Sequence, residues 1–188
     1  DHFMLVVNAS NNDKDWAWAN AVLCGEVQID PSRPMARLLD DPSQVTLRDL
    51  RDPKHGEACR VDIALQGQAS LGILQRMAHN EADKKRLASM AWSTVAPFKL
   101  GAFDLIVSRT GYTGERVAFE LFVHPQQAAA LFETLVEAGA QPCGLASRDS
   151  TRIEAGLPLY GHELGGLHAF TPSDAGFASY VKLWKPFF

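Results

Sequence analysis

Hydrophobic residues occur in short runs along the chain, and their spacing alternates between that of a strand and that of a helix. Residues 3–9 are apolar on both alternating faces, which predicts a central strand covered on both sides. Residues 12–23 then show helical spacing, with Asn12 as the expected N-cap and Gly25 as the stop. The side chains expected on the inward face of this helix are Trp16, Ala19, Asn20 and Leu23.

The pattern is interrupted between residues 30 and 57, where prolines and alternating charges leave only two short β-like runs, 27–29 and 45–50. This composition predicts a hairpin or an irregular loop. The paired carboxylates Asp40 and Asp41 lie in this excursion, and we interpret them as a solvated turn rather than an acid/base couple.

Regular periodicity returns at residue 60 and continues to residue 155. It predicts four strands, at 60–66, 98–100, 103–108 and 117–123. It also predicts four helices, at 69–77, 81–90, 125–138 and 145–155. In the last strand Val117, Phe119, Leu121 and Val123 are expected on one face, and in the third helix the expected core stripe is Leu131, Phe132, Leu135 and Val136.

The predicted strands are close together in the sequence and often pair as hairpins, which favours an antiparallel α+β fold over a doubly wound parallel sheet. At 188 residues the chain fits either one large domain or two small, intimately packed ones.

The charge and the cysteine content of the chain bear on the classes of molecule that it is expected to bind and on its expected cellular location. Eighteen Lys+Arg residues against 22 Asp+Glu residues give a net charge of −4, without the basic excess that nucleic-acid binding requires. No apolar stretch is long enough to span a membrane, so neither nucleic acid nor a membrane is an expected partner. The cysteines, Cys24, Cys59 and Cys143, are far apart and odd in number, which indicates neither a disulfide framework nor a metal site and favours a cytoplasmic location.

The segment Gly111-Tyr112-Thr113-Gly114-Glu115 lies between two predicted strands. Its glycines permit close backbone approach, Tyr112 offers a stacking face, and Glu115 offers a bidentate acceptor, a combination that suits a planar heterocycle bearing N–H donors. A glycine-rich hairpin turn with a solvated Glu is the alternative.

The helix at 145–155 places Arg148 and Arg152 one turn apart on one face, and Asp149 on the side of Leu145 and Ile153, which we expect to be inward. The arginines could hold a ligand carboxylate as a fork, or they could form surface ion pairs while the Asp accepts from backbone donors.

Tyr160, His162 and Glu163 lie close together in a loop after Pro158, where they fit either a catalytic cluster or packing. No second His or Cys lies at ligand spacing, so a metal is not expected. The remaining histidines are interpreted as structural or exposed, and the four tryptophans lack the interleaved basic residues of a base-stacking surface.

Several segments in order together resemble the T-protein (aminomethyltransferase) family of the glycine cleavage system. The segments are Val6-Val7-Asn8-Ala9-Ser10, Ala64-Leu65-Gln66-Gly67, residues 108–115, residues 143–150 and residues 152–163. The resemblance covers most of the chain and is weakest between Cys24 and Glu57.

This resemblance implies an α+β body that binds tetrahydrofolate and passes a one-carbon unit between a small donor and folate. By position, Glu115 would hydrogen-bond the pteridine ring with Tyr112 beside it, and Arg148 would bind the polar tail or shape the pocket. Asn8 would face the same cavity, and Tyr160 and His162 are weaker candidates. Whether a lipoyl carrier protein delivers the one-carbon unit is left open.

The resemblance also implies what the chain lacks. The family's catalytic Asp is expected upstream of residue 1 and a C-terminal β-barrel downstream, so the chain alone is expected to bind folate weakly and to turn nothing over. Two parts of a folate-binding domain are expected, at about 1–95 and 96–188.

Two departures from the family pattern favour a divergent member. Gln68 follows the Gln-Gly pair where the family has Pro, and Arg116-Val117-Ala118 replaces the commoner Asp-Gly pair. The alternatives are a folate-dependent demethylase of methylated amines, methyl-sulfur compounds or aryl methyl ethers, a non-catalytic folate-binding or assembly module, and one domain of a flavin-dependent oxidising enzyme.

Overall fold

The computed structural model describes residues 3–27, 32, 42–165, 167, 169–182 and 184. The chain divides into two compact units. One is Arg48–Leu157, and the other combines Asp1–Leu47 with Pro158–Phe188. The division expected near residue 95 stays a prediction; in the structure this residue begins a strand of the first of these units.

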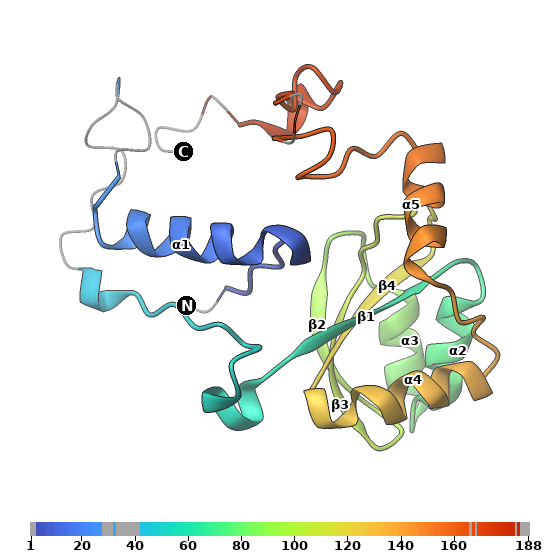
Figure 1. Ribbon diagram of the computed structural model, residues 1–188. Helices are drawn as coiled ribbons and strands as arrows, with labels where there is room; N and C mark the ends of the chain where they lie inside the picture. The colour runs from blue at the N-terminus through green and yellow to red at the C-terminus, as the bar shows by residue number, and fades with distance from the viewer. Residues whose placement is uncertain are drawn as a thin grey trace. The chain divides into compact units, whose positions relative to one another are not determined.

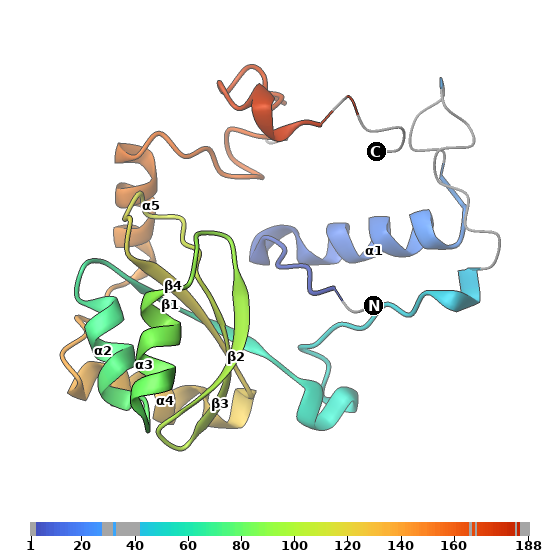
Figure 2. The same ribbon diagram turned by 180° about the vertical axis from the view of Figure 1, so that it is seen from behind.

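The unit Arg48–Leu157 is built on a four-stranded sheet (Figures 1 and 2). Its strands are β1 (Val61–Gln66), β2 (Val95–Leu100), β3 (Phe103–Ser108) and β4 (Ala118–Val123), in the order β1-β4-β3-β2. Every neighbouring pair is antiparallel, and the β2–β3 hairpin turns at Gly101 with Leu100 opposite Phe103. The predicted α+β class is therefore confirmed, as is the existence of all four strands.

Helices α2 (Ser70–Met77), α3 (Glu81–Ala88) and α4 (Ala128–Glu137) cover one face of this sheet, as Figure 1 shows. The core lies between these two layers. Its members are fully or nearly fully buried and include Leu65, Leu74, Leu87, Leu100, Val107, Phe119, Leu121 and Leu131. Alternation along each strand directs these side chains toward the helices, because successive residues of a strand point to opposite faces.

The same alternation places Asp62, Ser108 and Glu120 on the opposite face of the sheet. Ser108 is directly opposite Glu120 across β3 and β4, and Asp62 is two residues along β1 from the partner of Glu120. Helix α5 (Leu145–Glu154) lies at the end of the sheet where the β3–β4 loop turns (Figure 1).

The inward side of α5 differs from the expected one. Arg152 is the buried residue of the helix, at 2% exposure, whereas Leu145 and Ile153 are 76% and 59% exposed. The Arg152 guanidinium pairs with Asp149 at 3.0 Å and donates to the Leu157 carbonyl at 3.3 Å. The prediction that Leu145 and Ile153 face inward is therefore wrong. Arg152 occupies the buried position instead, and its guanidinium is bound by Asp149 of the same helix and by the Leu157 carbonyl just beyond the end of α5.

The expected face of β4 is confirmed, because Phe119, Leu121 and Val123 lie in the core and Val117 packs against it. Ala118 and Phe122, on the opposite face of the strand, are buried as well. In α4 Leu131 and Leu135 are buried as expected, but Phe132 is 46% exposed. A central strand is flanked by two neighbours, so alternation of residue type does not predict the burial of its second face.

The second unit contains α1 (Asn12–Leu23), preceded by a 3₁₀ turn at Ala9–Asn11. The helix has the predicted bounds, but Asn11 rather than Asn12 holds the N-cap position. No residue of α1 is fully buried, and Trp16 is 38% exposed. The unit also holds 3₁₀ turns at Pro42–Gln44 and Ala178–Tyr180.

The strand predicted at residues 3–9 does not form. Residues 3–8 adopt no regular structure, and Phe3 and Leu5 are 89% and 76% exposed. Within the described part of the chain no strand pairs with this segment, and an extended apolar run without a partner cannot satisfy its backbone hydrogen bonds as a strand.

The β-like run at 45–50 also forms no strand, and a 3₁₀ segment at Pro53–Ala58 follows it. Asp52, the residue before this 3₁₀ segment, caps it, because its side chain accepts a hydrogen bond from the Lys54 amide at 3.0 Å. Asp40, Asp41 and residues 28–29 lie outside the described residues.

Candidate functional site

The loop that joins β3 to β4 contains Gly111, Tyr112, Thr113, Gly114 and Glu115. A Cβ on Gly111 would clash with the Gln66 side chain and lie 2.6 Å from the Ala118 Cβ, so only glycine fits between β1 and β4 here. Gly114 has a φ of 82°, and a Cβ there would lie 2.5 Å from the Ala155 Cβ. Both glycines are therefore required, one for close approach and the other also for its backbone conformation.

Gln66, the last residue of β1, holds this loop to the sheet. Its amide nitrogen donates to the Phe119 carbonyl at 3.1 Å, and its amide oxygen accepts from the Thr113 hydroxyl at 2.9 Å. The Gln-Gly pair recognised in the sequence thus has a structural role, because one side chain links β1, β4 and the loop.

A second polar contact fixes the start of the loop. The Thr110 hydroxyl donates to the Glu120 carboxylate, and the Ser108 and Thr110 hydroxyls lie 2.7 Å apart. The loop thus leaves β3 in a conformation determined by side chains of both β3 and β4.

Glu115 ends the loop with an exposed side chain. Among the described residues no hydrogen bond or ion pair is made by this carboxylate. It lines a pocket of about 280 Å³ together with Trp92, Gly111, Gly114 and Arg116. A carboxylate with free acceptor positions at the edge of a pocket can bind a ligand's N–H groups.

Arg148, on the first turns of α5, lies with its guanidinium 6.0 Å from the centre of the Tyr112 ring. It is exposed, and it is also close enough to Asp62 to influence that carboxyl group. Asp62 keeps an exposed surface, but crowding by surrounding protein atoms and the nearby Glu120 carboxylate raise the pKa of this carboxyl group to about 7, whereas Arg148 acts to lower it. The structure therefore brings the loop residue Tyr112 and the helix residue Arg148 close together, and Asp62 lies near Arg148.

Asn8 lies in the other unit, and the strand that it was expected to end is absent. Its side-chain oxygen caps the 3₁₀ turn Ala9–Asn11 by accepting from the Ser10 amide at 3.0 Å. It also accepts from the Ser10 hydroxyl at 2.6 Å and the Asn11 amide at 3.2 Å. The oxygen is thus engaged locally.

Tyr160 belongs to the same unit as Asn8. Its carbonyl accepts from the Asn11 side chain at 3.1 Å, and the Lys14 ammonium lies 5.1 Å from the centre of its ring. His162 is exposed, and the Glu163 carboxylate accepts from the Leu159 amide at 2.8 Å. These contacts give Tyr160 and Glu163 structural roles in this loop, which agrees with the packing alternative.

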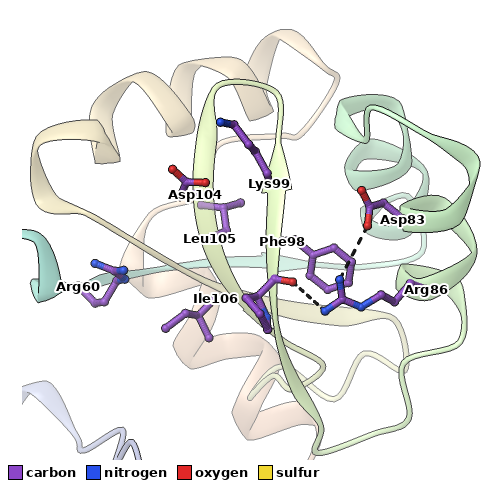
Figure 3. A pocket seen from close by; sticks show the side chains of 9 residues that line it. Arg60, Asp83, Arg86, Phe98, Lys99, Asp104, Leu105 and Ile106 are labelled. Carbon is purple, nitrogen blue, oxygen red and sulfur yellow. Dashed lines mark hydrogen bonds and ion pairs between the residues drawn. The ribbon is translucent and has the colours of Figure 1, made fainter.

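Another pocket, of about 330 Å³, lies against the β2–β3 hairpin (Figure 3). Its most prominent side chain, Arg86, stacks 4.2 Å from the centre of the Phe98 ring, donates to the Pro97 carbonyl at 2.8 Å and approaches Asp83 at 3.8 Å. Arg86 and Asp83 are thus paired with each other beside the edge strand β2, and Arg60, Lys99 and Asp104 also line this pocket.

Two further features bear on function. The described part of the chain contains no group of three or more His, Cys, Asp or Glu side chains that could hold a metal ion. Nor does any helix in the described ranges have the length and hydrophobicity needed to cross a membrane.

The sequence analysis missed Asp62 and Trp92. The alternation of Asp62 with Val61 and Ile63 could have signalled a carboxyl group on the face opposite the core. Trp92 is in a four-residue turn outside any periodic pattern, and only the fold brings it beside Glu115.

Comparison with known proteins places these features in a family. The chain is 37% identical to an aminomethyltransferase of Symbiobacterium thermophilum over 97% of its length, and 37% identical to one of Geobacillus kaustophilus over the same share. It is 38% identical to an aminomethyltransferase of Chlorobium chlorochromatii over 100% of its length. The chain spans only 43–44% of the length of these relatives. The family model described as the GCVT N-terminal domain matches residues 1–185, and the chain therefore belongs to this family.

Proposed function

We propose that this chain is the folate-binding part of an aminomethyltransferase-type enzyme, which transfers a one-carbon unit from a small donor to tetrahydrofolate. The observation that supports this most directly is the Glu115 carboxylate, exposed and without a partner among the described residues, at the edge of a pocket whose loop is held rigidly. A carboxylate in this setting is prepared to accept hydrogen bonds without first breaking others.

The chemistry of folate fits the residues of this unit. The pteridine ring is planar and presents N–H donors at one edge, for which Glu115 is the proposed acceptor. The glutamyl tail is anionic, and the exposed guanidinium of Arg148 is the proposed partner for it. Tyr112 would contribute its ring beside Arg148.

Asn8 and Tyr160 belong to the other unit, and each is proposed on its own as a candidate folate contact. The Asn8 oxygen is engaged in capping, but its amide nitrogen has no acceptor among the described residues and remains available as a donor. Tyr160 would contribute its phenol.

The donor and its delivery are also proposals. The relatives compared above are named aminomethyltransferase, which supports an aminomethyl donor. Delivery of this donor by a lipoyl carrier protein and a cytoplasmic location are further proposals. A folate-dependent demethylase and a non-catalytic folate-binding module are the alternatives. Formation of one-carbon-substituted folate by the full-length protein, measured with an aminomethylated carrier and separately with methylated amines, discriminates among these three.

Isothermal titration of tetrahydrofolate into the full-length protein tests the site. Glu115→Ala is expected to weaken binding by about 10- to 100-fold, because a charged acceptor typically contributes 1.5–3 kcal/mol. Arg148→Ala is expected to weaken it as well. Glu133→Ala, which removes an exposed carboxylate from α4, serves as the control. Unchanged affinity in both Glu115→Ala and Arg148→Ala would contradict the site assignment.

A further inference from the structure

Trp92 is a large aromatic side chain held at the surface by a strained turn. Its indole is 53% exposed, and it occupies the turn Ala91–Thr94, in which the Thr94 amide donates to the Ala91 carbonyl at 3.2 Å. The next residue, Ser93, has a φ of 62°, a conformation that residues other than glycine adopt rarely and at a cost. The backbone of this turn is therefore held in a specific conformation next to the exposed tryptophan.

The turn is attached to the end of β3 by two backbone hydrogen bonds. The Ser93 amide donates to the Arg109 carbonyl at 3.0 Å, and the Arg109 amide donates to the Thr94 carbonyl at 2.8 Å. The turn that presents Trp92 is thus hydrogen-bonded to Arg109, the residue that follows β3 and begins the Glu115 loop.

The Arg109 side chain fixes Trp92 and that loop relative to each other. Its guanidinium lies 5.7 Å from the Trp92 ring centre and 4.8 Å from that of Phe119. It also donates to the carbonyls of Ala118 and Arg116, each at 2.8 Å. One side chain therefore contacts the indole on one side of the pocket and holds the backbone next to Glu115 on the other.

The pocket combines features that recognise a flat heterocycle. Trp92 supplies an aromatic face, Glu115 supplies an acceptor at the edge, and the backbone of Gly111 and Gly114 lines the pocket together with Arg116. Stacking on an aromatic residue together with edge hydrogen bonds is how proteins bind planar, nitrogen-rich rings.

We propose that Trp92 is a positioning residue of the folate site, stacking on the pteridine ring whose N–H edge Glu115 binds. The proposal rests on the proposed function and deepens it, because it assigns this pocket to the ring rather than to the glutamyl tail. Loss of the stacking contact is expected to weaken tetrahydrofolate binding by about tenfold or more, since such contacts are typically worth 1–3 kcal/mol per ring.

Two ligands separate a binding role of Trp92 from a merely structural one. Tetrahydrofolate contains ring and tail, whereas p-aminobenzoylglutamate contains only the tail. In the full-length protein Trp92→Ala is expected to weaken tetrahydrofolate binding and to leave binding of p-aminobenzoylglutamate unchanged, while Trp92→Phe stays close to the wild type. Trp18→Ala, which removes a similarly exposed indole from α1, is the control. Equal weakening of both ligands by Trp92→Ala would overturn the proposal, because it would indicate damage to the fold.

Fluorescence gives an independent readout. Trp16, Trp18, Trp184 and any tryptophan of the full-length protein outside these 188 residues can be replaced by Phe, which leaves Trp92 as the single tryptophan. Tetrahydrofolate is expected to quench its emission with the same midpoint as calorimetric binding, and a variant that retains only Trp18 is expected to show no such quenching.

The outcomes distinguish this inference from the proposed function. If Glu115→Ala abolishes tetrahydrofolate binding while Trp92→Ala changes neither affinity nor quenching, the inference is wrong and the proposed function stands. If the unmodified protein does not bind tetrahydrofolate, both are wrong.

Discussion

Gly114 and Ala155 lie so close together that a Cβ on the glycine would be 2.5 Å from the Cβ of the alanine. The contact joins the Glu115 loop to the end of α5, the helix that carries Arg148. Two proposed ligand contacts that are 33 positions apart in the sequence are thus held on segments that touch directly.

Replacing Gly114 by alanine is expected to destabilise this junction. The substitution introduces a side chain at a φ of 82° and a contact with Ala155 that must be relieved by moving the loop or the helix. We expect the free energy of unfolding, measured by urea denaturation, to fall by about 2–4 kcal/mol. Gly139→Ala is the matched control, because it also has a positive φ but nothing within 4 Å of the added Cβ. Its cost should be limited to about 1–2 kcal/mol, and equal losses would show that the contact with Ala155 is unimportant.

Arg152→Met tests the buried arginine of α5. Removal of the guanidinium leaves the Leu157 carbonyl and the Asp149 carboxylate without this donor, and we expect a loss of about 2–4 kcal/mol in the free energy of unfolding. Arg148→Met, the same change at an exposed position one turn away, is expected to cost about 0.5 kcal/mol or less. A comparable loss of stability in the two variants would mean that the buried contacts of Arg152 do not stabilise the protein more than an exposed arginine does.

Substitution of two leucines tests whether Leu145 of α5 is exposed, as the structure shows, or faces inward, as the sequence predicted. Leu74→Ala in α2 removes a side chain with no exposed surface and is expected to cost about 2–5 kcal/mol. Leu145→Ala, at 76% exposure on α5, should change the free energy of unfolding by no more than about 0.5 kcal/mol. A large loss in Leu145→Ala would restore the original prediction that this residue faces inward.

Asp62→Asn tests the raised pKa on the open face of the sheet. Between the ordinary pKa of an Asp, near 4, and the folded-state pKa of about 7, the unfolded chain has lost the proton that the folded protein retains. Stability is therefore expected to fall as the pH rises through this interval and then to level off. The Asn variant should lack this part of the decline, as measured by denaturation at pH 4, 5, 6, 7 and 8. Asp104→Asn, on the same face of β3, should retain the decline, and parallel curves for Asp62→Asn and wild type would contradict the assignment.

Hydrophobic periodicity predicted the antiparallel sheet and its helices well, because each of these elements is fixed by its own pattern and its own turn. Residues 103–108 were predicted with the bounds that the structure shows, since the strand alternates and ends at turns on both sides. Residues 3–9 have an equally strong apolar pattern, yet they form no strand, because a strand also requires a partner that periodicity cannot supply.

The residues of the candidate site also fall into two groups, those that the sequence predicted and those that only the fold reveals. Glu115 and Arg148 could be named from the sequence because they belong to ordered motifs, and the glycines of the loop indicated close backbone approach. The alternation in β1 indicates only the face on which Asp62 lies, whereas its neighbours, like those of Arg109 and Trp92, come from distant parts of the sequence and are revealed by the fold alone.

Local periodicity and residue types required at specific positions were enough to predict the α+β class, the elements between residues 60 and 155 and the loop that presents Glu115. The fold alone revealed which face of α5 is buried, which carboxyl group lies near Arg148 and which aromatic ring borders the Glu115 pocket. The last two depend on packing between segments distant in the sequence, as does the contact of Gly114 with Ala155, and no single segment's hydrophobic pattern contains that information.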